Sequence, residues 1–148
     1  MDRAEIAVDT MRSGFNCAQS MVKAYAAELN ADEAAVVRMA APFGGGIGRN
    51  GYVCGAVSGA VMVIGARFGN ADAADTAARD RAYAAVSKLL EKFREEHHTV
   101  LCRELISFEI NNPEGYQRAR EAGVFQNRCP LFLRSVGKIL DEILASAD

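Results

Sequence analysis

The sequence predicts an all-α fold, a single-domain helical bundle around one buried central helix at about residues 53–68. Three observations predict it. Residues 53–66 are apolar on every side of a helix, and no charge occurs between Arg49 and Arg67, so this segment should be buried all round. Residues 72–97 repeat apolar positions at helical spacing. No segment alternates between apolar and polar residues as a half-buried strand does.

The helices expected before the central one follow side chains that can cap a helix N-terminus. They cover residues 2–13 with Asp2, residues 17–29 with Asn16, and residues 33–41 with Asp32. After the central helix we expect helices at residues 72–97, 102–106, 113–122 and 129–146. The first of these should bury Ala77, Ala84, Leu89, Leu90 and Phe93. The last should bury Leu131, Val136, Ile139, Leu140, Ile143 and Leu144.

Length and composition narrow the class of protein. The 148 residues suit one domain spanning residues 1–148. A net charge of −2 without a basic patch argues against nucleic acid as a partner. The apolar segment is shorter than the roughly 20 residues of a membrane span, so no membrane insertion is expected. The first residues lack the basic and then apolar order of a signal peptide, so we expect a cytoplasmic location. The oligomeric state stays open, a homodimer included.

The four cysteines carry most of the chemical information. They are Cys17, Cys54, Cys102 and Cys129. A reducing compartment disfavours structural disulfides, so an even number of cysteines there favours redox work, a metal site or simple burial. No two of them have C-x-x-C spacing, so neither a zinc ribbon nor a thioredoxin-like motif is present.

The cysteines coincide with expected helix starts. Cys17, Cys54 and Cys129 lie at such starts, and Cys102 lies early in its short helix. Free amides and the positive end of the helix dipole favour thiolate over thiol, which makes a cysteine a nucleophile or a metal ligand. Four such residues could form two dithiol pairs, or bind zinc or an iron–sulfur cluster. The alternative is that they are inert, buried small hydrophobes.

A glycine-rich loop precedes Cys54. Its Gly46 to Gly51 segment fits G-x-G-x-x-G, but the strand that a dinucleotide fingerprint requires before it is missing. The loop amides beside a helix start could bind an anion or a small polar ligand, and the candidate residues for that site are Gly45, Gly46, Gly48 and Gly55. Gly51, Gly55 and Gly59 are spaced four apart, which predicts a shared helix face for close packing that also leaves room around Cys54.

The four cysteines and their contexts resemble the C_GCAxxG_C_C family, small bacterial and archaeal proteins described as redox-active. The resemblance lies in Phe-Asn-Cys17-Ala-Gln, in Cys54-Gly-Ala-Val-Ser-Gly59, in Cys102-Arg-Glu-Leu and in Cys129-Pro130, and it covers nearly the whole chain. It implies a helical fold and a redox role. A similar helical module in a split-Soret type of cytochrome c is associated with an iron–sulfur centre, which supports the metal alternative.

These observations lead to three hypotheses. The first is a thiol redox protein in which Cys54 attacks and Cys17, Cys102 or Cys129 resolves, acting on a partner protein or a small molecule. Cys54 is preferred because the glycine loop and small neighbours should leave it approachable. In the second, the four thiolates hold a [2Fe-2S] or similar cluster, or zinc, for electron transfer. The third is a helical ligand- or partner-binding domain with inert thiols.

Overall fold

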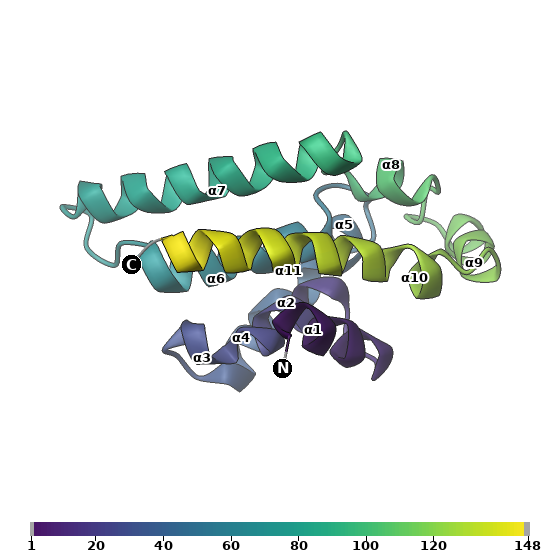
Figure 1. The fold of residues 1–148 in the computed structure, drawn as a ribbon. Coiled ribbons are helices and arrows are strands. Elements are labelled where there is room, and N and C mark those ends of the chain that lie inside the picture. The colour runs from purple at the N-terminus through teal and green to yellow at the C-terminus, as the bar shows by residue number, and fades with distance from the viewer. Residues whose placement is uncertain (1, 147–148) are drawn as a thin grey trace.

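The computed structural model describes residues 2–146, and it is helical throughout (Figure 1). The helices are α1 (Arg3–Arg12), α2 (Cys17–Ala24), α3 (Ala26–Leu29), α4 (Glu33–Ala40), η1 (Ala41–Phe43), α5 (Gly44–Ile47), α6 (Gly55–Phe68), α7 (Thr76–His97), α8 (Cys102–Ile106), α9 (Pro113–Glu121), α10 (Val124–Asn127) and α11 (Cys129–Ser146). The described residues contain no strand, and their one β-contact is an isolated antiparallel bridge between Val53 and Leu101. The predicted all-α class is therefore confirmed.

The central helix is α6, as predicted. It packs against α2 on one side and against α7 and α11 on the others. Figure 1 shows α6 and α11 between the long α7 and the layer of α1 to α4, while α8, α9 and α10 gather at one end. Its buried residues are Gly55, Ala56, Val57, Gly59, Ala60, Val63 and Ile64. The burial decreases toward the last turn, where Gly65 and Ala66 are exposed.

The predicted caps form because their side chains satisfy amides that a helix start leaves free. Asp2 accepts a hydrogen bond from the Ala4 amide at 2.9 Å. Asn16 forms a capping box with Gln19, in which each side chain accepts from the other residue's backbone amide. Asp32 accepts from the Ala35 amide at 3.1 Å.

Several local predictions were wrong. The long helix begins at Thr76, because Asp75 accepts from the Ala78 amide and so caps the helix there. Ala77 and Ala84 are exposed, whereas Ala78 and Ala82 are buried. Neighbouring alanines occur on both faces, so residue type could not identify the buried one.

Three further differences are a break in one helix, an exposed position in another and one additional short helix. The helix predicted at residues 17–29 is interrupted at Tyr25, which separates α2 from α3. Leu131 is 51% exposed although it lies in α11, because the helix turns this position away from the core. The short helix α10 was not predicted.

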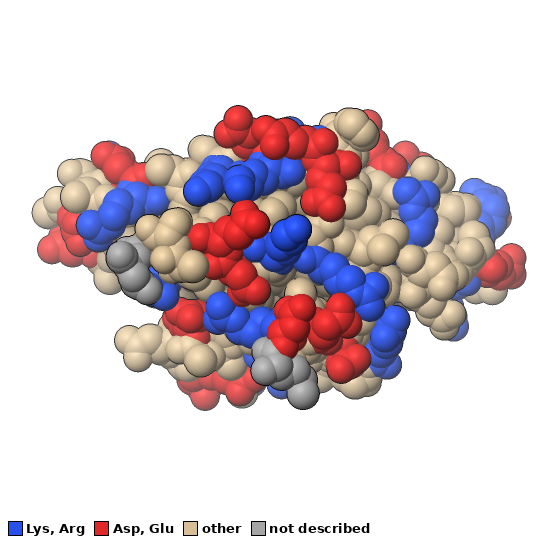
Figure 2. All heavy atoms as spheres, viewed as in Figure 1, with Lys and Arg blue, Asp and Glu red and all other residues tan. Residues whose placement is uncertain are grey.

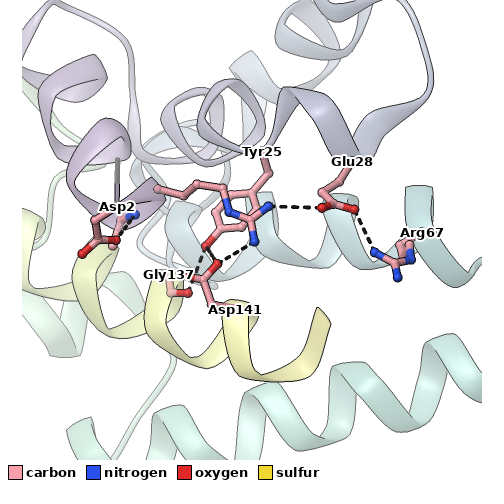
Figure 3. Close-up of polar contacts among 8 residues, drawn as sticks. Asp2, Tyr25, Glu28, Arg67, Gly137 and Asp141 are labelled. Atoms are coloured by element: carbon pink, nitrogen blue, oxygen red, sulfur yellow. Dashed lines mark hydrogen bonds and ion pairs between the residues drawn. The ribbon is translucent and has the colours of Figure 1, made fainter. Parts of the chain in front are cut away.

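A polar network joins α1, α3, α6 and α11 around the buried Tyr25 (Figure 3). The Tyr25 hydroxyl lies 2.7 Å from Asp141 Oδ1 and 2.9 Å from the Gly137 carbonyl oxygen, and it donates to these acceptors. Arg3 pairs with Asp141 at 3.0 Å and with Glu28 at 3.2 Å, and its guanidinium lies over the Tyr25 ring. Glu28 also pairs with Arg67, at 2.9 Å.

Basic and acidic side chains lie close together on the face that carries α7, α11 and α1 (Figure 2). Lys92 of α7 pairs with Glu142 of α11 at 3.0 Å. Arg134 of α11 pairs with Glu5 of α1 at 2.7 Å. Exposed pairs of this kind add little stability. They show that charge on this face is balanced locally.

Candidate functional site

The four cysteines line one cavity of about 1310 Å³. Cys17, Cys102 and Cys129 are the first residues of α2, α8 and α11, and Cys54 directly precedes α6 as its N-cap. The prediction that cysteines lie at helix starts is confirmed, with Cys54 one position earlier than the first turn. Four helices from distant parts of the chain therefore point their N-terminal ends at the same space.

Cys54 and Cys102 are brought together by backbone pairing. The Cys54 amide donates to the Val100 carbonyl at 2.8 Å, and the Cys102 amide donates to the Tyr52 carbonyl at 2.6 Å. These bonds flank the bridge between Val53 and Leu101. Since side chains alternate between the two faces of an extended segment, Cys54 and Cys102 lie on the same face of this short ladder.

Gly55 allows Cys17 to approach Cys54. A Cβ atom on Gly55 would lie 3.2 Å from the Cys17 Cβ and 3.1 Å from the Ala18 amide nitrogen. On the next turn, a Cβ on Gly59 would lie 2.7 Å from the Ala18 carbonyl oxygen. The absence of side chains at both glycines lets α6 pack closely against α2, as predicted for this pair. Gly51 does not share their helix face, because it belongs to the loop and packs against Arg103.

Cys17 and Cys129 form an interacting pair. A hydrogen bond from Cys17 lowers the pKa of Cys129, and the nearby Arg128 lowers it further, while burial opposes both. The same hydrogen bond, burial and the other thiolates raise the pKa of Cys17 well above its ordinary value. The Cys17 sulfur also lies 3.7 Å from the Met11 sulfur. A thiol donates more strongly to a thiolate than to a neutral thioether, so Cys129 is the preferred acceptor once it ionises.

Cys54 and Cys102 have the opposite character. Burial raises the pKa of Cys54 to about 11, although the amides of Ala56 and Val57 pull it downward. Burial, with the charge of Cys54, raises the pKa of Cys102 to about 12. Cys54 is only 4% exposed. It is therefore less accessible than we expected from the glycine loop and the small residues beside it in the sequence.

The glycine loop borders the cavity. Gly45, Gly48 and Gly55 line it, whereas Gly46 is buried behind it, where a Cβ would lie 2.8 Å from the Cys102 Cβ. The amides of Gly48, Arg49, Gly51 and Tyr52 donate to carbonyls within the loop and the turn before it. These amides are therefore already engaged, so the loop shapes the cavity wall.

One of the comparisons with known proteins gives a match. The family model described as "Putative redox-active protein (C_GCAxxG_C_C)" matches residues 15–143, a range that includes all four cysteines. The chain belongs to this family. No curated protein and no solved structure gives a match to it. Membership carries the family's redox-active description without specifying the reaction.

The donor set of this family member suits some metal groups better than others. Within residues 2–146, no three histidine, cysteine or carboxylate side chains lie close enough together to hold one metal ion. A single zinc ion would need such a group. A [2Fe-2S] cluster needs two thiolates for each iron, and two cysteine pairs face the cavity. His97 lies outside the cavity lining, with its Nε2 2.8 Å from the Ser135 hydroxyl.

The cavity lining includes basic and aromatic residues that the sequence did not single out. Arg12, Arg49 and Arg120 contribute to it, together with Tyr116. The Arg49 guanidinium lies 3.9 Å from the centre of the Tyr116 ring and donates to its hydroxyl at 3.2 Å. Arg49 is a lone arginine in a glycine-rich loop and could have been singled out from the sequence, but nothing in the sequence connected it with Tyr116.

None of the described helices is long and apolar enough to cross a membrane.

Proposed function

We propose that the protein is a thiol–disulfide redox protein in which Cys129 attacks and Cys17 resolves. The observation that carries the proposal is the interaction of these two thiols in one cavity, which lowers the pKa of Cys129 and raises that of Cys17. Thiol–disulfide exchange needs one thiolate to attack and a second thiol beside it to release the product. Cys54 is a weaker candidate for attack, because burial keeps its thiol protonated at neutral pH.

In the first step, the Cys129 thiolate attacks a substrate disulfide R–S–S–R. A Cys129–S–S–R bond forms, and one R–S⁻ leaves with the electron pair of the broken bond. Cys17 then loses its proton to solvent or to the departing thiolate and attacks the Cys129 sulfur. The Cys17–Cys129 disulfide forms and the second R–S⁻ leaves. The protein dithiol is oxidised by two electrons and the substrate disulfide is reduced to two thiols.

Cys54 and Cys102 form the second pair of this proposal. Their location on one face of the backbone ladder supports the pairing, and their raised pKa values keep both as thiols at neutral pH. They should react more slowly than Cys129, and only after the first pair is oxidised or the pH is raised.

The test is to oxidise the reduced protein with a limiting amount of a disulfide reagent and to map the first bond by mass spectrometry of peptides. The proposal expects two of four thiols to disappear together, with Cys17 linked to Cys129. A first disulfide between Cys54 and Cys102, or none at all, would contradict it. The matched controls are the Cys54→Ala and Cys102→Ala variants, which should still form the Cys17–Cys129 bond.

A second candidate function is electron transfer through a bound iron–sulfur cluster. It is favoured by the convergence of all four cysteines on one cavity in two pairs, which suits two irons with two thiolates each. Cys17, Cys54, Cys102 and Cys129 would hold the cluster, which would supply one-electron chemistry. Purification without oxygen, with measurement of iron, sulfide and free thiols, separates the two. Iron and sulfide near one cluster per chain or dimer, with masked thiols, would replace the dithiol proposal.

A further inference from the structure

We infer that the cavity binds an anionic small molecule, and that the disulfide substrate is one that carries carboxylate groups. That the ligand is a disulfide substrate rests on the proposed function. The anion site itself is inferred from the residues that line the cavity. Among residues 2–146, three arginines border the cavity, Arg12, Arg49 and Arg120, and no aspartate or glutamate does. The thiols therefore lie in a space whose fixed charges are all positive.

The arginines come from separate elements. Arg12 ends α1, Arg49 lies in the glycine loop, and Arg120 lies in α9. Within residues 2–146 none of the three forms an ion pair, although Arg12 is near Glu5, which is already engaged by Arg134. On the face of Figure 2, by contrast, basic side chains lie beside acidic ones. The cavity is thus lined by three arginines that have no carboxylate partner among the described residues.

Tyr116 brings two of these cations together. The Arg49 guanidinium lies 3.9 Å from the centre of its ring, and that of Arg120 lies 6.0 Å from it. Both guanidinium groups lie beside one ring, so an anion bound there can be attracted by two positive charges. Stacking and a hydrogen bond to the tyrosine also hold Arg49 in place, so less entropy is lost when it binds a ligand. Guanidinium groups bind carboxylates with paired hydrogen bonds.

The burial of the thiols favours a small molecule over a protein disulfide. The cavity of about 1310 Å³ is larger than most ligand pockets, which enclose roughly 300–1,000 Å³. Cys54, Cys102 and Cys129 are only 4–9% exposed, so the disulfide of a folded partner could not reach them without opening the site. A free disulfide with carboxylate arms can enter, place its charges at the arginines and present its sulfurs to Cys129.

The first experiment compares three probe disulfides with the reduced protein, each rate being divided by the rate of the same probe with a free small thiol. The probes are 5,5′-dithiobis(2-nitrobenzoate), which is dianionic, 4,4′-dithiodipyridine, which is neutral, and cystamine, which is cationic. We expect the corrected rate of the anionic probe to exceed that of the neutral probe by about tenfold at low salt and to fall as salt screens the arginines. Cystamine should be slower than the neutral probe.

The decisive variant is Arg49→Gln combined with Arg120→Gln. It should abolish most of the preference for the anionic probe, measured as the ratio of the anionic to the neutral probe's corrected rate in the same variant. The matched control is Arg81→Gln with Arg94→Gln, which removes two exposed arginines of α7 outside the cavity lining and should keep the preference. An anionic-to-neutral ratio near one, or a ratio that the cavity variant does not change, would overturn the inference.

A binding measurement separates this inference from the proposed function. The unreactive dicarboxylate 4,4′-thiodibenzoate and the uncharged 4,4′-thiodiphenol can be titrated by calorimetry, since neither contains a disulfide. Saturable binding of the dicarboxylate that is lost in the cavity variant supports the anion site even if no exchange occurs. Exchange with the neutral probe but no dicarboxylate binding would leave the redox proposal intact and reject the anion site.

Discussion

Two regions of α11 differ in how the polar groups beside them are paired. At Gly137 and Asp141 the helix meets Tyr25, Arg3 and Glu28 in a network where every charge has an opposite partner (Figure 3). At Cys129 the same helix opens on a cavity with four thiols and three arginines, and none of the carboxylates that the structure describes lines it. The first region joins helices together. The second leaves chemical groups unneutralised beside open space.

The difference shows which polar groups serve folding. A buried polar group that has all its partners costs little and specifies how the helices pack. The buried cysteines also pack in the core, but the exposed arginines without carboxylate partners add little to stability, so the groups around the cavity are the candidates for chemistry. The following predictions test that division, from the largest expected effect to the smallest.

The largest effect should come from Cys129→Ser. A serine hydroxyl is not ionised at neutral pH, so the rate of reaction with 4,4′-dithiodipyridine should fall at least about 100-fold. The companion Cys17→Ala should still react at Cys129, more slowly because the hydrogen bond from Cys17 that lowers the pKa of Cys129 is lost. It should then stop at a mixed disulfide, visible by mass spectrometry. A wild-type rate in Cys129→Ser would remove the proposed role of that residue.

The thiols should also make the fold sensitive to alkali. The pKa of Cys54 is raised from an ordinary 9.0 to about 11 in the folded protein, so the unfolded chain releases its proton first. Stability is therefore complete below about pH 9 and falls as pH rises toward 11, by about 1.4 kcal/mol per pH unit for each such thiol. Denaturant unfolding at a series of pH values measures this slope.

The control for that slope is a variant pair. Cys54→Ala should flatten the loss between pH 9 and 11, because it removes one group whose folded pKa is raised. Tyr25 contributes a loss of the same sign above pH 10, since burial and Asp141 raise the pKa of its phenol, and Tyr25→Phe isolates that part. An unchanged slope in Cys54→Ala would show that the thiol titrates normally in the folded state.

Two glycines in α6, Gly59 and Gly65, test the close packing of α6 against α2. Gly59→Ala puts a Cβ 2.7 Å from the Ala18 carbonyl oxygen and should cost about 1–3 kcal/mol of unfolding free energy, because α6 and α2 must separate. Gly65→Ala, in the same helix, meets nothing within 4 Å and should stabilise by about 0.5–1 kcal/mol through helix propensity. Thermal unfolding of both variants is the measurement, and equal shifts in one direction would refute the packing argument.

The smallest effect concerns the Tyr25 hydroxyl. Tyr25→Phe should cost about 1 kcal/mol, because Asp141 keeps its pair with Arg3 after the hydrogen bond is lost. Its thiol reactivity should equal that of the wild type. Tyr83→Phe, at a position 66% exposed, should change neither property and serves as the control. A change of thiol reactivity in Tyr25→Phe would mean that the two regions of α11 are coupled.

Much of the fold followed from local patterns. The caps at Asp2, Asn16 and Asp32 form as expected, because capping depends on a side chain and amides two or three residues away. The bounds of α8 and α11 also agree with prediction. The start of α7 and the inward alanines were wrong, because a run of alanines and aspartates offers several helix starts and several faces of equal hydrophobicity.

The candidate site was predictable in its parts and not in its arrangement. The four cysteines, their helix starts and the close packing at Gly55 and Gly59 were predicted from residue types and spacing, and family membership agrees with the cysteine pattern. Cys54 was expected to be approachable from its small neighbours. Its burial arises from segments around Val100 and Cys102 that pack beside it, and no local pattern reports them.

The sequence by itself determined most of the helices, the caps at Asp2, Asn16 and Asp32, and a cysteine at each of four helix starts, because these depend on neighbours within one or two turns. Only the tertiary structure decided that Cys17 lies beside Cys129, that Cys54 shares a ladder face with Cys102, and that Arg49 and Arg120 meet at Tyr116. The physical reason is that such contacts close long loops. The entropy cost of closing these loops is offset by helix packing across the whole core and not by the contacting residues themselves.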